Sequence, residues 1–255
     1  MLSKILASAD RRAIATDAAI DQYRELARGA SPARDFTKAL TSEGLSIIAE
    51  IKRRSPSVGD ISTDLDPVRQ AVAYEAGGAS AISVLTEPDF FGGSLDDLRA
   101  VRDAVSVPVL RKDFTRSTSQ IWEARAAGAD AVLVIVAALS DAAIGAMLDT
   151  AQEAGLTAVV EAHTIEELHR AIEVGASVVG VNNRDLHTFE TDLAVAEEAA
   201  DHLHGDVVSI AESGVSTTSS AARMARAGYD AILVGEALVR APDPAAMVEA
   251  LRSVR

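Results

Sequence analysis

The chain has 255 residues, of which 38 are aspartate or glutamate and 24 are lysine or arginine, giving a formal net charge of −14. Such an acidic surface repels nucleic-acid phosphates and anionic membranes, and no apolar run is long enough to cross a bilayer, so we expect neither partner. The absence of cysteine excludes disulfides, thiolate metal sites and cysteine nucleophiles, and the charged first residues predict a cytoplasmic protein.

Residues 1–45 precede the first β-rich run and carry helical patterns at roughly 3–27 and 33–41. We expect these helices to cap one end of the domain. From residue 46 onward, eight short apolar runs alternate with helical patterns, at 46–51, 80–85, 107–111, 131–136, 157–161, 177–181, 206–211 and 231–235. Their near-continuous apolar character is typical of parallel strands that are buried on both faces.

Four of these runs repeat one motif, in which a helix-like end leads through a glycine into a strand: AGGASAISV (76–84), AGADAVLVI (127–135), VGASVVGVN (174–182) and AGYDAILVG (227–235). Glycine at that position accepts the left-handed conformation that ends a helix. We expect Asp66, Ser94, Thr164 and Ser216 to begin helices as capping residues. Eight strand–helix units predict an α/β fold, a (β/α)8 TIM barrel at 46–255 that forms a single domain together with the N-terminal helical extension.

Charged side chains follow several of the apolar runs. Only four lysines occur beside 20 arginines, and two of them, Lys52 and Lys112, come just after strands; Lys52 lies two residues beyond Glu50. Two later strands end at Glu161 and Glu212. A barrel places its active site at the C-terminal ends of its strands, so these side chains should meet at one rim. Neighbouring acids and bases shift one another's pKa values toward neutrality, which favours proton transfer.

A phosphate site is predicted at the same rim. The glycines Gly214 and Gly235 follow the last two strands, where barrels commonly bind phosphate through main-chain N–H groups and a short helix. Ser55 and Arg184 offer a hydroxyl and a guanidinium. The carboxylate of Glu236 would repel a phosphate, so we expect its side chain to point outward while its N–H faces the ligand.

With these residues in place, the chain resembles the indole-3-glycerol-phosphate synthase family. The resemblance covers nearly everything from residue 36 onward, and its matching segments are IAEIKRRSPS (48–57), FFGGS (90–94), VLRKDF (109–114), VVEAH (159–163), VNNRDL (181–186), IAESG (210–214) and ILVGEALVR (232–240). The resemblance implies conversion of 1-(2-carboxyphenylamino)-1-deoxyribulose 5-phosphate to indole-3-glycerol phosphate, carbon dioxide and water. It implies no metal and no organic cofactor, a phosphorylated small molecule as partner, and we expect a monomer.

The resemblance also implies roles for individual residues. Lys112 is the general acid for ring closure, Glu161 is the partner carboxylate for proton removal, and Glu50 and Lys52 act in the later dehydration and in holding the substrate. The reacting part would be oriented by Asn182, Glu212 and Ser213. The phosphate would be held by Ser55, Arg184, Gly214 and Gly235, beside Glu236, and the aromatic ring by Phe91, Phe114, Leu133 and Leu186. Which carboxylate serves which proton-transfer step stays open.

Other interpretations of the same residues remain. A Schiff-base aldolase acting through Lys112 is one, and a non-catalytic phosphosugar-binding barrel is another, although a binder needs no rim of paired lysines and glutamates. Val58 stands where many members of the family carry lysine, which bears on rate more than on identity. We interpret His163 as a loop residue, and His202 and His204 as no metal site, because no acidic partner follows at ligand spacing.

Overall fold

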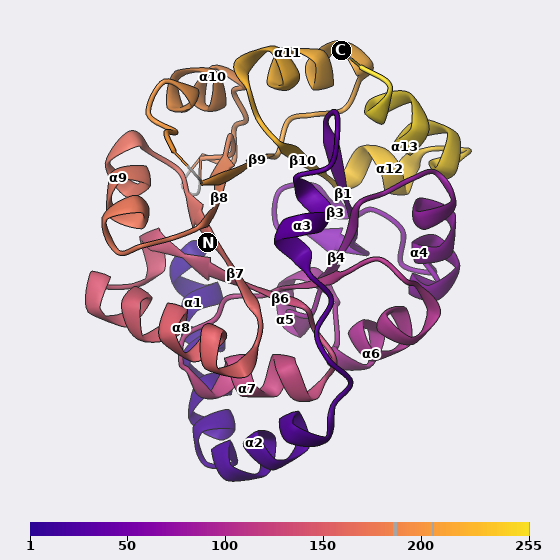
Figure 1. Ribbon diagram of the computed structural model, residues 1–255. Helices are drawn as coiled ribbons and strands as arrows, with labels where there is room; N and C mark the ends of the chain where they lie inside the picture. Colours follow the sequence, from indigo (N-terminus) through magenta and orange to yellow (C-terminus); the bar gives the residue numbers. More distant parts are fainter. Residues whose placement is uncertain (186–187, 206, 255) are drawn as a thin grey trace.

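A computed structural model describes residues 1–185, 188–205 and 207–254. Eight parallel strands close into a barrel in the order β1, β10, β9, β8, β7, β6, β5, β4, inside a ring of helices (Figure 1). The strands of the barrel are β1 (Ser46–Ile51), β4 (Ala81–Leu85), β5 (Val109–Lys112), β6 (Ala131–Ile135), β7 (Thr157–Ala162), β8 (Val178–Asn182), β9 (Val208–Glu212) and β10 (Ala231–Val234). The predicted TIM barrel is confirmed, although residue 206, where the seventh strand was expected to begin, lies outside the described residues.

Helices follow the strands around the outside of the barrel. They are α4 (Pro67–Ala76), α5 (Pro88–Phe91), α6 (Leu95–Ala104), α7 (Ser119–Ala126), the 3-10 helix η1 (Val136–Ala138), α8 (Asp141–Ala154), α9 (Ile165–Glu173), α10 (Ala194–Ala200), α11 (Thr218–Ala227), α12 (Glu236–Arg240) and α13 (Pro244–Arg252). After β1, a short antiparallel hairpin is formed by β2 (Arg54–Ser55) and β3 (Gly59–Asp60). Within the described ranges, none of these helices is both long and apolar enough to span a bilayer.

Most of the capping residues predicted from the sequence lie at the ends of helices in the structure. The side chain of Asp66 accepts hydrogen bonds from Val68 N and Arg69 N, which caps α4 as predicted. The expected cap at Ser216 is wrong by one residue, because Thr217 and Ser220 form the capping box of α11. In the repeated motif, the glycines take φ values between 88° and 93°, the left-handed conformation predicted for them: Gly78, Gly128, Gly175 and Gly228.

Two apolar layers hold the barrel together. The outer layer packs the helices on the strands, and the inner layer fills the interior of the barrel. The inner layer comprises Ile48, Ala81, Leu110, Ala131, Leu133, Ile135, Val159, Val178, Val208, Ile210, Ala231 and Leu233. Phe36 and Leu40 belong to it and are fully buried. The interior is therefore a packed core below the mouth, not a channel.

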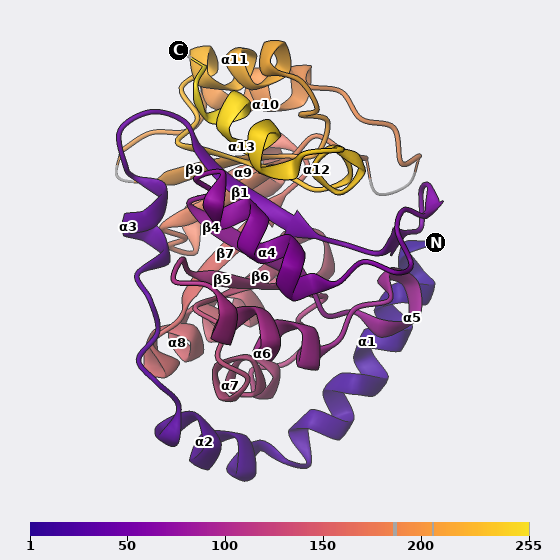
Figure 2. The same ribbon diagram turned by 90° about the vertical axis from the view of Figure 1, so that its right-hand side faces the viewer.

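The extension forms three helices, α1 (Leu2–Asp17), α2 (Ile20–Gly29) and α3 (Phe36–Leu40). The single helix expected over 3–27 is wrong, because the chain turns at Ala18 and Ala19, where Ala19 has a non-helical ψ of 14°. Neither glycine nor proline marks this turn; instead α2 turns to pack against α7. Figure 2 shows the extension running from the N-terminus, beside α5, past α2 to α3 on the opposite side. It thus closes the N-terminal end of the barrel, and α1 also reaches the mouth.

Candidate active site

A cavity of about 420 Å³ lies at the C-terminal ends of the strands. Its size is in the range of small-ligand sites. It is lined by every predicted site residue that the structure describes: Glu50, Lys52, Ser55, Phe91, Lys112, Phe114, Leu133, Glu161, Asn182, Arg184, Glu212, Ser213, Gly214, Gly235 and Glu236. The remaining one, Leu186, lies outside the described residues. Side chains from the whole length of the barrel sequence therefore meet in one place.

The alternation of side chains along each strand brings the charged groups together. Lys112 stands two residues after Leu110, and Glu161 stands two residues after Val159; both Leu110 and Val159 belong to the interior core. Residues two apart on a strand point to the same face, so the interior apolar layer continues upward into a layer of charges. Glu50 follows Ile48 in the same way. The packed core thus forms the floor on which the polar groups stand.

Lys112 is the centre of this polar layer. Its Nζ lies 2.6 Å from Glu161 Oε2 and also contacts Glu212 Oε2. Only 13% of its side chain is exposed. Burial by itself would lower the pKa of Lys112, but Glu161, Glu212 and Glu50 together raise it, so the shift toward neutrality expected from the sequence is wrong for this lysine, because nearby opposite charges favour the charged form. The ammonium is therefore held in its charged form.

The two glutamates beside Lys112 differ from each other. Burial would raise the pKa of Glu161, yet Lys112 and His163 hold it well below its usual range. For Glu212, burial raises the pKa, and the neighbouring Glu161 adds to the rise against the effect of Lys112. Glu212 Oε1 is buried and has no hydrogen-bond partner among the described residues. One carboxylate is thus ionised, and the other is the group that takes up a proton more readily.

A second acid–base pair lies at the mouth, on β1 and the residue after it. Lys52 Nζ donates a hydrogen bond of 2.7 Å to Glu50 Oε1, and Ser83 Oγ lies 3.5 Å from Glu50 Oε2. A Cβ atom at Gly235 would come within 2.6 Å of Glu50 Oε1, so only glycine leaves room for this carboxylate. Glu50 and Lys52 therefore form an ion pair at the mouth of the barrel.

The residues expected to hold phosphate lie around the same rim. Ser213 and Gly214 both adopt positive φ angles, 63° and 82°, which turn the chain sharply after β9 and leave their N–H groups at the mouth. Arg184 lines the cavity while its Nη1 donates to the carbonyl of Phe189, 2.9 Å away. Glu236 Oε1 accepts from Arg240 Nε at 2.9 Å, so its carboxylate is drawn to the cation one helical turn further on.

An apolar wall faces these polar groups. The rings of Phe91 and Phe114 lie 6.3 Å apart with a 39° tilt, and Leu133 completes the expected set of described residues. Phe91 is presented by the short helix α5, whose first turn is capped by Glu87 through the main-chain N–H groups of Phe90 and Phe91. A flat aromatic group fits against such a wall.

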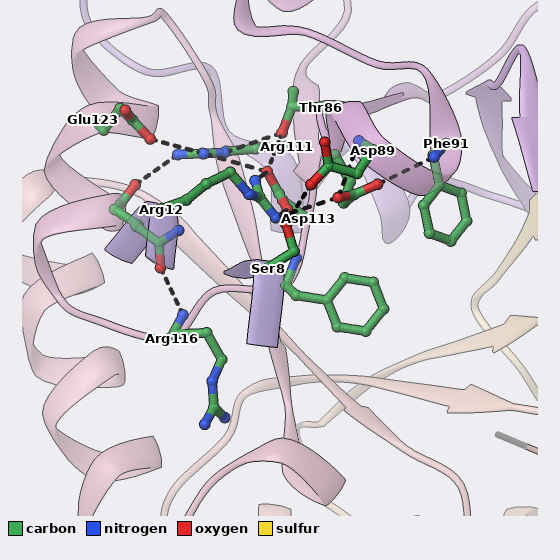
Figure 3. A network of polar contacts seen from close by, with 12 residues as sticks. Ser8, Arg12, Thr86, Asp89, Phe91, Arg111, Asp113, Arg116 and Glu123 are labelled. Carbon is green, nitrogen blue, oxygen red and sulfur yellow. Dashed lines mark hydrogen bonds and ion pairs between the residues drawn. The ribbon is translucent and has the colours of Figure 1, made fainter. Parts of the chain in front are cut away.

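The strand that carries Lys112 is anchored by a buried polar network. Arg111 and Asp113, its two neighbours, take part in this network together with Arg12 and Thr86 (Figure 3). Arg12 donates two hydrogen bonds to the Asp113 carboxylate, at 2.9 and 3.0 Å. Burial would raise the pKa of Asp113, but Arg111, Arg12 and Thr86 lower it. A bidentate pair of this kind fixes geometry as well as charge, and it ties α1 to the catalytic strand.

Some lining residues were missed by sequence reasoning. Leu2 and Ile5 of α1 line the cavity, although nothing in the first helix distinguishes them from ordinary apolar positions. His163 lies in the loop between β7 and α9 as interpreted, outside the cavity lining, and its imidazole is buried between two carboxylates, which the sequence did not predict. Its position two residues after Glu161 was the available signal. Val58, in the β2–β3 hairpin, is 48% exposed. Within the described ranges, no group of three His, Cys, Asp or Glu is arranged to hold a metal ion.

Comparison with known proteins agrees with this geometry. The family model described as indole-3-glycerol phosphate synthase matches residues 2–251. The chain belongs to this family. The indole-3-glycerol phosphate synthase of Kineococcus radiotolerans is 52% identical over 241 residues, which cover 92% of this chain and 87% of the relative. That of Mycobacterium avium is 52% identical over 229 residues, covering 90% and 84%. The resemblance seen in seven segments is thereby confirmed.

Solved structures support the fold alone. The 3-hexulose-6-phosphate synthase of Salmonella typhimurium superimposes with a TM-score of 0.65 at 17% identity, covering 82% of this chain and 97% of that one. The thiamine phosphate pyrophosphorylase of Pyrococcus furiosus gives 0.62 at 17% identity, with coverages of 86% and 96%. At such identities a shared barrel carries no shared chemistry, so the function must be argued from the site itself.

Proposed function

We propose that the mouth of this barrel closes the indole ring of 1-(2-carboxyphenylamino)-1-deoxyribulose 5-phosphate and releases carbon dioxide and water. This is the carboxy-lyase reaction of the indole-3-glycerol phosphate synthase family, a step of tryptophan biosynthesis. The observation that carries the proposal is the Lys112 ammonium, held between Glu161 and Glu212 at the floor of a cavity with one apolar and one polar wall. Such a site suits a substrate with an aromatic ring at one end and a phosphate at the other.

Ring closure needs a stronger electrophile, because the aromatic carbon is a weak nucleophile. Lys112 donates a proton to the ketone oxygen as the aromatic carbon attacks the carbonyl carbon, and a fixed cation in a buried site stabilises the charge that develops there. The carbon–carbon bond to the carboxylate then breaks, its electrons restore the aromatic ring, and carbon dioxide leaves. The raised pKa of Lys112 suits a donor that keeps its proton until the oxygen has become basic.

Ring closure converts the ketone oxygen into a hydroxyl group. Dehydration then removes this hydroxyl group as water. A base must take a proton from the ring system while an acid protonates the departing oxygen. Glu161 is placed for proton removal, and the pair formed by Glu50 and Lys52 is placed to assist the loss of water and to hold the substrate. The reacting part is oriented by Asn182, Glu212 and Ser213.

The remaining predicted residues bind the two ends of the substrate. The phosphate is held by Ser55, Arg184 and the main-chain N–H groups of Gly214, Gly235 and Glu236. The aromatic ring lies against Phe91, Phe114 and Leu133. Leu186 is the fourth contact of the ring that was predicted from the sequence. No step in this scheme calls for a metal or an organic cofactor. We expect a monomer as the active form, and light scattering during turnover tests this.

The direct test is incubation of the purified protein with the carboxyphenylamino-deoxyribulose phosphate, followed by indole fluorescence. We expect turnover by the native chain and little by Lys112→Arg, because arginine keeps the charge but does not release its proton. Borohydride added with a keto-phosphate should trap no adduct, since a lysine held as a cation is a poor Schiff-base nucleophile. A trapped adduct, or native turnover by Lys112→Arg, would overturn the proposal.

A further inference from the structure

His163 is a buried histidine that lies directly behind the catalytic layer. It follows the end of β7 and precedes Thr164, the N-cap residue of α9. Only 7% of its side chain is exposed, and it is absent from the residues that line the cavity. It stands two residues after Glu161, so both side chains leave the chain toward the same face. The imidazole is thus in a position to act on Glu161 and not on the substrate.

Each ring nitrogen of His163 faces a carboxylate oxygen. Nε2 lies 3.2 Å from Glu161 Oε1, and Nδ1 lies 3.2 Å from Glu167 Oε2. Nδ1 is within hydrogen-bonding geometry of Glu167, whereas Nε2 meets Glu161 at ion-pair distance without hydrogen-bond geometry, so the attraction to Glu161 is electrostatic and favours the charged ring. The other oxygen of Glu161, Oε2, meets the ammonium of Lys112. Glu161 is therefore held between two cations, one on each oxygen.

The far side of the imidazole is fixed by α9. Thr164 Oγ1 accepts a hydrogen bond from Glu167 N at 3.1 Å, which places Glu167 in the first turn. The Glu167 carboxylate reaches back and accepts from the main-chain N–H of His163 at 2.8 Å as well as facing its ring. This is the fold-back of a capping-box glutamate, directed here to the residue before the cap. The ring is thereby attached to a rigid element.

We infer that His163 is a positioning residue: its imidazolium, fixed by Glu167, orients the Glu161 carboxylate toward Lys112 and keeps it ionised, which makes Glu161 and Glu212 unequal. Glu212 also contacts Lys112, but its Oε1 has no hydrogen-bond partner within the described part of the chain. The inference rests on the proposed function, and it assigns the role of base to Glu161 and not to Glu212.

The charges around His163 agree with this assignment. Glu161 of β7 and Glu167 of α9 face the ring, with Lys112 of β5 beyond the first and Arg170 of α9 near the second. Burial would lower the pKa of His163, but the two glutamates raise it to about 9. The ring is therefore charged across the neutral range, and a cation at this distance favours the ionised form of Glu161.

Kinetics of His163→Gln test the inference, with His169→Gln, at an exposed histidine of α9, as the matched control. We expect kcat to fall about tenfold or more with KM changed less than about twofold, because the ring orients the base without touching the substrate. The acid limb of the pH profile of kcat/KM should move upward by about one unit, since a carboxylate that loses a cation is protonated more easily. In a Glu161→Gln background, His163→Gln should have no further effect on kcat.

A second arm keeps the histidine and does not depend on turnover. In the native protein, the NMR signal of His163, assigned by its absence in His163→Gln, should titrate near pH 9. Glu167→Gln should lower that pKa and reduce kcat in the same direction as His163→Gln, whereas Glu166→Gln, on an exposed neighbour, should change neither. An imidazole that titrates near its ordinary value, or a Glu167→Gln variant with native kcat and a native pH profile, would overturn the inference. If Lys112→Arg were fully active, the proposed function would fail while the titration still reported on the contact between His163 and Glu161.

Discussion

The two ends of the barrel both carry buried charges, but these charges have different partners. At the N-terminal end, Asp130 precedes β6 and accepts hydrogen bonds from Arg34 N at 2.7 Å and Val109 N at 2.8 Å. Asp230 precedes β10 and accepts from the main chain and the hydroxyl of Ser209, each at 2.8 Å. At the mouth, Glu212 Oε2 contacts Lys112 Nζ, whereas Glu212 Oε1 has no hydrogen-bond partner among the described residues.

This difference indicates that the charges at the N-terminal end stabilise the fold, whereas those at the mouth serve the reaction. The carboxylates at the N-terminal end accept hydrogen bonds from main-chain N–H groups of a neighbouring strand, and Asp130 also binds Arg34 N of the extension and the guanidinium of Arg102, so these groups hold packed segments together. The groups at the mouth face one another, and their pKa values are moved by burial and by like charges. Such an arrangement contributes less to stability but leaves proton donors and acceptors free to act on a substrate. Substitutions at the two ends should therefore have opposite consequences for turnover and for the free energy of unfolding.

The largest effect is expected from Lys112→Met at the mouth. Methionine fills a similar volume but carries neither charge nor proton, so kcat should fall by about 1000-fold or more. Binding of the anionic substrate should stay measurable by calorimetry, because the phosphate contacts remain. Lys38→Met, at an exposed position in α3, is the control and should be fully active. Turnover of Lys112→Met within tenfold of the native rate would contradict the assignment.

At the N-terminal end, Asp130→Ala should act on stability alone. It leaves two main-chain N–H groups without their acceptor, which costs about 2–4 kcal/mol in the free energy of unfolding measured with urea. Because Asp130 lies outside the cavity, kcat/KM at 25 °C should stay within about twofold of the native value. A large loss of activity at unchanged stability would contradict the inference that charges at the N-terminal end act on stability and not on turnover.

Gly180→Ala introduces a methyl group beneath the charged layer. A Cβ atom there would lie 2.1 Å from Glu212 Oε1, so the carboxylate must move away from Lys112. We expect kcat to fall about 100-fold, as for a displaced catalytic group. Gly145→Ala in α8 is the control, since its Cβ meets nothing within 4 Å and alanine favours a helix. Native kinetics for Gly180→Ala would show that the position of Glu212 is unimportant.

Arg184→Ala distinguishes binding from chemistry within the mouth. We expect KM to rise about tenfold while kcat stays within about threefold, because a phosphate contact acts equally on substrate and transition state. Arg99→Ala, which removes an exposed arginine paired with Asp96, serves as the control in steady-state kinetics. A fall in kcat at unchanged KM would place Arg184 with the reacting groups instead.

The smallest effect concerns the pH dependence of stability. The pKa of His163 is raised in the folded protein to about 9, so its contribution is fully present below pH 6.5 and is lost as the pH rises through 9. The difference in unfolding free energy between the native protein and His163→Gln should therefore shrink by about 1 kcal/mol or more between pH 6 and pH 9.5. Urea titrations of both proteins at the two pH values measure it, and a constant difference would argue against a charged ring.

Much of the site was predictable because strands impose a strict alternation. Glu50, Lys112, Glu161 and Glu212 could be placed at one rim from the position of each within its apolar run. His163 was placed correctly in a loop, but its contacts were not predicted, because its second partner, Glu167, comes from the next helix and only the folded chain shows both contacts. The turn at Ala18 and Ala19 was unpredictable for a related reason, since no residue there breaks a helix.

The sequence by itself determined the barrel, its strand ends and the identity of the family, since these depend on local periodicity and on short ordered motifs. The tertiary structure alone decided that α1 reaches the cavity through Leu2 and Ile5 and that Arg12 binds Asp113. It alone made the two glutamates beside Lys112 unequal. Burial and the distances between charges set these properties, and both arise only when segments far apart in the chain come together.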